Sequence, residues 1–223
     1  MLSFKRITSR GTDEITVVPK ALIVAGWTGR DEAALRHHIE ELAAIGVPRP
    51  SSVPVFYRNA VSNIVQTERL EVLGPDTSGE VEPVYLALPD GLWVGLGSDH
   101  TDRKAETMGI ALSKQLCGKV TGNELWNFQE LEGHWDEIII RSFATIGGER
   151  ALYQEGSLAA LRRPEQLVGL AAPFPVSTVL FGGTIGAKGG IRPASRFEME
   201  LEDPVLKRRM THAYDVVDLP VIT

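Results

Sequence analysis

Short runs of strand-forming residues, separated by turns, recur along the whole chain and constrain its fold most strongly. Runs rich in valine, isoleucine and aromatic residues predict strands, whereas helical spacing is confined to a few places. The expected strands are 14–18, 21–25, 53–58, 64–73, 80–88, 92–96, 125–131, 135–143, 179–183 and 197–201. Many short strands with few helices indicate an α+β, mainly β domain rather than a doubly wound one.

The exceptions to the strand pattern predict a few helices. The expected helical segments are 28–44, part of 101–115, and 164–171. In the first, Leu35, Ile39 and Leu42 recur at helical spacing. Thr28 is its expected N-cap, and Gly46 is expected to end it.

Length and composition are those of a single globular domain. The 223 residues suffice for one core, with N-terminal strands over 1–20, a main body over 21–202 and a C-terminal extension over 203–223. The formal net charge of −6 argues against nucleic-acid binding.

The cysteine count and the apolar pattern indicate a cytoplasmic location. The single cysteine, Cys117, excludes an intramolecular disulfide and is expected to be a buried, inert thiol. There is no apolar leader at the start and no apolar run long enough to cross a membrane. We therefore expect a cytoplasmic protein.

Acidic side chains in two neighbouring strand segments form a candidate metal site. Glu80 and Glu82 are two residues apart and share one face of an extended strand. Asp99, from a nearby segment, could bring a third carboxylate. Three carboxylates with open positions suit Mg²⁺ or Mn²⁺. The alternative is a set of solvated carboxylates beside a turn, and Asp102 is expected to pair with Arg103 or Lys104.

A histidine and a glutamate on the first helix form a candidate catalytic pair. His38 and Glu41 are three residues apart and therefore lie on one helix face. Glu41 would orient the imidazole so that His38 takes a proton from water. His37 and Glu40 have the same spacing, and a surface ion pair is the alternative for either couple. His100, beside Asp99, is expected to make structural hydrogen bonds.

A glycine-rich segment near the end of the body is a candidate anion site. Backbone N–H groups at Gly183 and the hydroxyl of Thr184 could bind a substrate carboxylate. Arg58 and Lys114 are candidate cations for the same anion. The alternatives are a plain hairpin turn and surface charges.

In chain order, these segments resemble the fumarylacetoacetate hydrolase superfamily. The matching motifs are 22–28 leading to His38-Ile39-Glu40-Glu41-Leu42, then Glu80-Val81-Glu82, then Ser98-Asp99-His100-Thr101-Asp102-Arg103, and finally 179–186 followed by 196–202. The turn into 53–58 matches more loosely. The chain departs from the family pattern at Pro83, at Ser98 in place of Asn, and at Ile185 in place of Pro.

The resemblance implies a mixed β-roll or β-sandwich with a few short peripheral helices, assembled as a homodimer. It implies one Mg²⁺ or Mn²⁺ on Glu80, Glu82 and Asp99. The implied activity is hydrolysis of a C–C bond in a small β-dicarbonyl or 2-oxo acid of the acylpyruvate type. Decarboxylation or hydration at the same site, or metabolite binding without turnover, are the alternatives.

The resemblance also assigns roles to individual residues. His38, oriented by Glu41, would activate water. Lys114, with Lys119 as the other candidate, would act together with Thr184 to fix the substrate's carboxylate or developing negative charge.

Overall fold

The computed structural model describes residues 1–44 and 49–222, apart from the side chains of His38, Glu41, Leu42 and Ala44. Within these ranges the chain is an α+β protein built mainly of strands, as the sequence predicted. Gly46, the expected end of the first helix, lies outside the described residues. None of the described helices is both long enough and apolar enough to cross a membrane.

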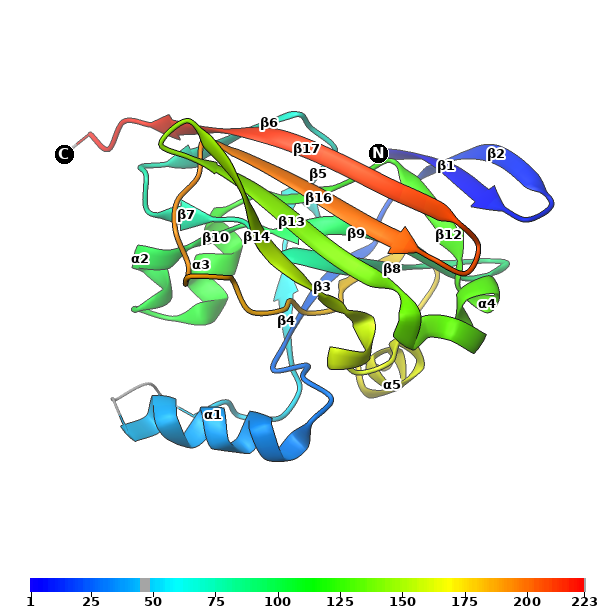
Figure 1. The fold of residues 1–223 in the computed structure, drawn as a ribbon, viewed down its shortest axis with the longest axis horizontal. Helices are drawn as coiled ribbons and strands as arrows, with labels where there is room; N and C mark the ends of the chain where they lie inside the picture. The colour runs from blue at the N-terminus through cyan, green and yellow to red at the C-terminus, as the bar shows by residue number, and fades with distance from the viewer. Residues whose placement is uncertain (45–48, 223) are drawn as a thin grey trace.

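The larger sheet contains the strands that carry the candidate site (Figure 1). Its order is β2 (Gly11–Val17), β1 (Leu2–Thr8), β12 (Glu124–Asn127), β9 (Gly91–Asp99), β8 (Val81–Leu88), β15 (Thr178–Phe181), β3 (Ala21–Gly26) and β4 (Val55–Asn59). The short strands β11 (Lys119–Thr121) and β5 (Ile64–Val65) extend it beside β9. Parallel and antiparallel pairs both occur, so the sheet is mixed.

A second sheet crosses in front of the first in Figure 1. Its order is β14 (Glu149–Ser157), β13 (Ile139–Ile146), β16 (Arg196–Asp203), β17 (Arg208–Leu219) and β6 (Arg69–Leu73). The segment 203–223, set apart above as an extension, thus supplies β17, which pairs along its length with β16 and β6.

Short helices and one further strand pair occupy the periphery. The helices are α1 (Glu32–Ala44), α2 (Arg103–Glu106), α3 (Ile110–Leu116), α4 (Phe128–Leu131) and α5 (Pro164–Leu170), with 3-10 turns η1 (Val61–Asn63), η2 (Glu132–Glu137) and η3 (Leu158–Ala160). The strands β7 (Thr77–Ser78) and β10 (Thr101–Asp102) pair with each other. Helix α1 lies below the two sheets in the view of Figure 1.

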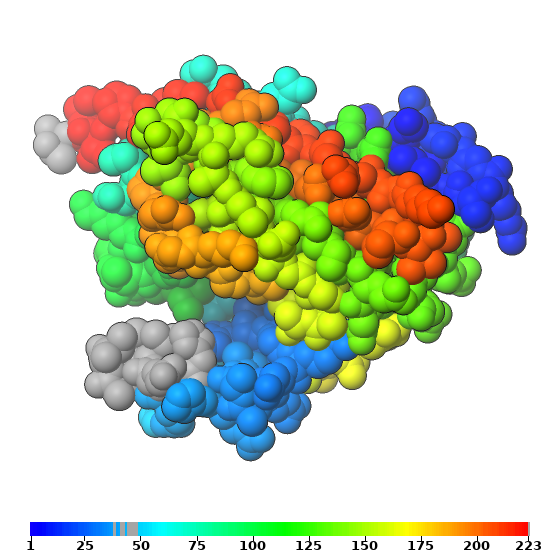
Figure 2. Space-filling view, in the orientation of Figure 1, coloured from blue at the N-terminus to red at the C-terminus, as the bar shows by residue number. Residues whose placement is uncertain are grey.

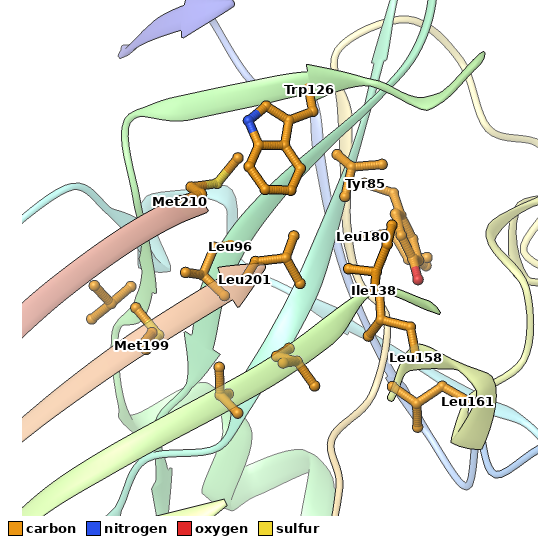
Figure 3. Close-up of a cluster of buried hydrophobic side chains, with 14 of the residues drawn as sticks. Tyr85, Leu96, Trp126, Ile138, Leu158, Leu161, Leu180, Met199, Leu201 and Met210 are labelled. Carbon is orange, nitrogen blue, oxygen red and sulfur yellow. The ribbon is translucent and has the colours of Figure 1, made fainter. Parts of the chain in front are cut away.

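The main core fills the space between the two sheets (Figure 3). Tyr85 and Leu96 come from the larger sheet, whereas Met199, Leu201 and Met210 come from the smaller one. Side chains of successive strand residues point to opposite faces. The alternate residues of β3, β8 and β15 therefore form a second cluster that contains Leu22, Val24, Val84, Leu86 and Phe181.

Several predicted boundaries were wrong for local reasons. Helix α1 begins at Glu32, because the Asp31 side chain accepts from Ala33 N at 2.9 Å and Ala34 N at 3.0 Å; Asp31, not Thr28, is the N-cap. The run expected as one strand over 125–131 ends at Asn127, whose side chain caps α4. The run over 135–143 begins with a 3-10 turn, so its strand starts at Ile139.

Candidate metal centre and its cavity

The hairpin of β8 and β9 brings the three predicted carboxylates together. A tight turn at Pro89 and Asp90 pairs Val81 with Ser98, and the N–H of Asp99 donates to the carbonyl of Glu80 at 3.0 Å. Glu80, Glu82 and Asp99 can each offer an oxygen such that all three lie within 4.8 Å of one another. The spacing rule that placed Glu80 and Glu82 on one face is consistent with this geometry.

Burial makes the charge state of these carboxylates depend on their neighbours. Glu82 is 1% exposed, and burial, followed by the nearby charge of Asp99, raises its pKa well above the usual carboxyl value. Its Oε2 accepts from the N–H of Gly183 at 2.8 Å, and no cationic side chain is paired with it among the described residues. A divalent cation would supply the missing positive charge.

Asp99 is fully buried between two lysines. Its Oδ2 is bound by Lys114 Nζ, and Lys119 Nζ lies 2.7 Å from its Oδ1. Burial acts to raise the pKa of Asp99, but the two lysines outweigh it and lower the pKa to about 2. Asp99 is therefore ionised at neutral pH, as a metal ligand must be.

The two lysines, considered above as alternatives, both contact Asp99 but differ in access. Lys114 lines the cavity and also lies 3.7 Å from Glu80 Oε2, whereas Lys119 is 0% exposed and donates to the carbonyl of His100 at 2.6 Å. Burial disfavours the charge on Lys114, but Asp99, Glu80 and Glu82 together raise its pKa above the usual lysine value. Lys114 therefore presents a fixed positive charge to the cavity.

Arg103 is a site residue that sequence reasoning considered only as a partner for Asp102. Its guanidinium donates to Glu80 at 2.8 Å, to Glu106 at 2.9 Å and to the hydroxyl of Ser78 at 2.7 Å. It thereby orients the most exposed of the three carboxylates.

The predicted ion pair of Asp102 was wrong, because the Asp102 carboxylate caps α2 by accepting from Ala105 N at 2.8 Å.

A cavity of about 780 Å³ opens over the site. Glu80, Glu82 and Lys114 line it, together with Gly183 and Thr184 from the loop after β15. Asp99 lies behind this wall. Carboxylate oxygens beside a protonated lysine in a walled cavity are suited to binding a hard metal ion and an anionic oxygen ligand.

The donors of the glycine-rich loop are already used within the protein. The N–H of Gly183 holds Glu82, and the Thr184 hydroxyl donates to the Val81 carbonyl at 2.8 Å while it accepts from Gln154. Gly183 has φ of 93°, and a Cβ there would lie 1.8 Å from Thr28 Oγ1, so glycine is required. This loop orients Glu82 rather than offering a free anion site.

The other predicted residues lie elsewhere or outside the described set. Arg58 is exposed, whereas its strand neighbour Tyr57 lines the cavity, because adjacent residues of β4 face opposite ways. The structure does not bring Arg58 to the site. The helix carrying His38 and Glu41 forms, but both side chains lie outside the described residues.

His100 makes the structural hydrogen bonds that the sequence predicted. Its ring nitrogens lie 2.9 Å from Tyr214 OH and 2.9 Å from Thr77 Oγ1. Burial, with the nearby positive charge of Lys119, lowers the pKa of His100 to about 3. His100 is therefore neutral and links β9 to the second sheet.

The sequence matches one family profile, described as a protein of unknown function, DUF2848, over residues 25–214. The chain belongs to the DUF2848 family. The matched span includes the hairpin, the three carboxylates and both lysines. No curated protein matches the sequence.

Solved structures share the fold of this DUF2848 chain at low sequence identity. A structure of Cg1458 aligns with a TM-score of 0.63 and 14% identity, over 94% of this chain and 81% of that one. A 2-keto-3-deoxy-D-arabinonate dehydratase complexed with magnesium and 2,5-dioxopentanoate aligns with a TM-score of 0.62 and 15% identity, over 91% and 74%. The apo form of that dehydratase aligns with a TM-score of 0.60.

Proposed function

We propose that this protein is a divalent-metal-dependent enzyme of the fumarylacetoacetate hydrolase superfamily that hydrolyses a C–C bond in a small β-dicarbonyl or 2-oxo acid. The observation that carries the proposal is the convergence of Glu80, Glu82 and Asp99 beside a cavity that Glu80 and Glu82 line. The magnesium and the oxo compound named for the dehydratase of similar fold support the same class of site. The fold would then be the mixed β-roll of that superfamily.

The residues of the site have distinct roles in this proposal. Glu80, Glu82 and Asp99 would hold Mg²⁺ or Mn²⁺, which acts as a Lewis acid toward substrate oxygens when it is bound. Lys114 remains protonated at the cavity wall and stabilises negative charge that develops on the substrate. Arg103 keeps Glu80 in place. The role of His38 as catalytic base, oriented by Glu41, stays a prediction. Assembly as a homodimer also stays a prediction.

Titration with metal ions tests the centre directly. We expect calorimetry to show one-site binding of Mg²⁺ or Mn²⁺ to the wild-type protein. Glu82→Gln should weaken that binding by at least about tenfold, because it removes a ligand charge but keeps an acceptor for the Gly183 N–H. Glu71→Gln, a change on the exposed edge of β6, should leave binding unaltered.

Absence of metal binding by the wild-type protein, with or without oxalate, would contradict the enzyme proposal and favour a metabolite-binding protein. Product analysis with acylpyruvates then separates the reactions. Hydrolysis releases a carboxylic acid and pyruvate, and decarboxylation releases CO₂. Loss or gain of water is the second candidate reaction, favoured by the dehydratase among the similar folds.

A further inference from the structure

The cavity over the candidate metal centre is much larger than an oxo-acid head group needs. Its volume of about 780 Å³ lies in the range of pockets that enclose drug-sized ligands. Figure 2 shows a recess between the blue surface of the α1 segment and the green and orange surfaces above it. A pyruvate-sized group at the carboxylates would leave most of this volume for the rest of the substrate.

The walls beyond the carboxylates are mainly apolar. The larger aromatic and aliphatic residues that line the cavity are Trp27, Leu35, Tyr57, Ile110, Tyr153, Ile185 and Ile191. They come from the loop before α1, from α1, β4, α3 and β14, and from the loop after β15. The Tyr153 hydroxyl already accepts from the N–H of Arg192 at 3.0 Å, so this residue offers mainly its ring.

The cationic side chains in the lining are already paired with carboxylates. Among the described lining residues, the cations are Arg103 and Lys114. Arg103 is paired with Glu80 and Glu106, and Lys114 with Asp99 and Glu80. Neither is left to receive a second carboxylate at the far end of a substrate, and an unpaired carboxylate among apolar walls is strongly disfavoured.

On the basis of the proposed function, we infer that the substrate carries an uncharged, apolar acyl tail of medium length or an aromatic ring. The carboxylate and oxo groups lie at the acidic wall, and the tail lies against the apolar wall. Each buried methylene of the tail adds to affinity, whereas a terminal carboxylate removes that gain.

A matched pair of ligands tests the inference without turnover. Binding of 2-oxooctanoate and of 2-oxosuberate, which has the same chain length and a terminal carboxylate, is measured by calorimetry with saturating Mg²⁺. Oxalate serves as a probe of the head-group site alone. We expect 2-oxooctanoate to bind at least about tenfold more tightly than 2-oxosuberate.

A charge placed on the apolar wall should change this preference. Ile191 is 55% exposed and lines the cavity, so Ile191→Arg is compatible with folding and adds a cation for the terminal carboxylate. The ratio of the two affinities should fall by at least about fivefold in this variant. Leu170→Arg, at a residue of α5 that is 57% exposed and does not line the cavity, should leave the ratio unchanged.

The outcomes separate the tail inference from the proposed function. Equal affinity of the wild-type protein for the two ligands, with oxalate bound, overturns the apolar tail and leaves the metal enzyme standing. A similar change of ratio in the Leu170 variant also overturns it, because the effect would then be long-range. Failure of oxalate and both oxo acids to bind overturns the proposed function and the inference together.

Discussion

Asp99 illustrates how single residues depend on partners far away in sequence. The sequence around Asp99 predicts a metal ligand at this position, but it does not predict that two lysines bind the two carboxylate oxygens. Removing one partner of such a buried pair is costly, because a charge is then left without a counter-ion. Lys114 and Lys119 are therefore both needed, one at the cavity wall and one behind it.

Cys117 is the buried thiol that the sequence predicted, and burial raises its pKa to about 11. A thiol that is neutral in the folded state stabilises that state fully below the unfolded pKa, and this contribution is lost as pH rises toward 11. At pH 8 the thiolate population is roughly a hundredfold below that of an ordinary cysteine.

We therefore expect slow alkylation of the native protein by iodoacetamide at pH 8, with a rate that still rises with pH beyond 9. Mass spectrometry can follow the reaction, because the chain has a single cysteine. The same protein in urea provides the fast reference, and Cys117→Ser provides the unlabelled control. Equal rates in native and unfolded protein would show that the thiol is neither buried nor shifted.

At the scale of elements, the segment after β9 changes from strand to helix at Asp102. Asp102 caps α2, which carries both Arg103 and Glu106. The helix is short, so its position depends on this cap and on the N–H of Arg103, which donates to the carbonyl of Asp76 at 2.7 Å. The cap thereby helps to hold the guanidinium that orients Glu80.

Asp102→Ala should lower the free energy of unfolding by about 1 kcal/mol, because the Ala105 N–H loses its acceptor. Asp102→Asn should retain most of the stability, since its amide oxygen can accept the same bond. Urea unfolding of the three proteins measures the difference. An equal loss in both variants would mean that charge, rather than capping, is what matters at this position.

At the scale of the whole molecule, Gln154 joins the two sheets beside the site. Its Oε1 accepts from the N–H of Val81 at 3.0 Å and from Ser142 at 2.9 Å. Its Nε2 donates to Thr184 at 2.8 Å and to the carbonyl of Ile185 at 2.6 Å. One side chain from β14 thus holds the strand of Glu80 and Glu82 and the loop that binds Glu82.

Gln154→Leu should lower the free energy of unfolding by roughly 2–4 kcal/mol, because a similar volume remains but several buried polar groups lose their partners. Ser142→Ala removes only one of these bonds and should cost about 1 kcal/mol. Chemical denaturation of both variants measures the losses. A loss in the leucine variant no larger than in the alanine variant would show that the network does not act as a unit.

Local sequence rules determined the fold class, most strands and the shared face of Glu80 and Glu82. These features depend on side-chain alternation and turn chemistry over a few residues. Helix α5 and the hairpin after Pro89 were predicted for the same reason. Strand β14 escaped prediction because its charged residues, including Glu149 and Arg150, mask the alternation.

Only the tertiary structure decided which distant residues meet. Three features depend on contacts between segments that are separated in the chain. They are the ion pair of Arg103 with Glu80, the pairing of both lysines with Asp99, and the inclusion of β17 in a sheet. The same holds for the loss of Arg58 from the site, since the register of β4 turns Tyr57 to the cavity instead. Local patterns specify conformation and facing, whereas burial and register select partners.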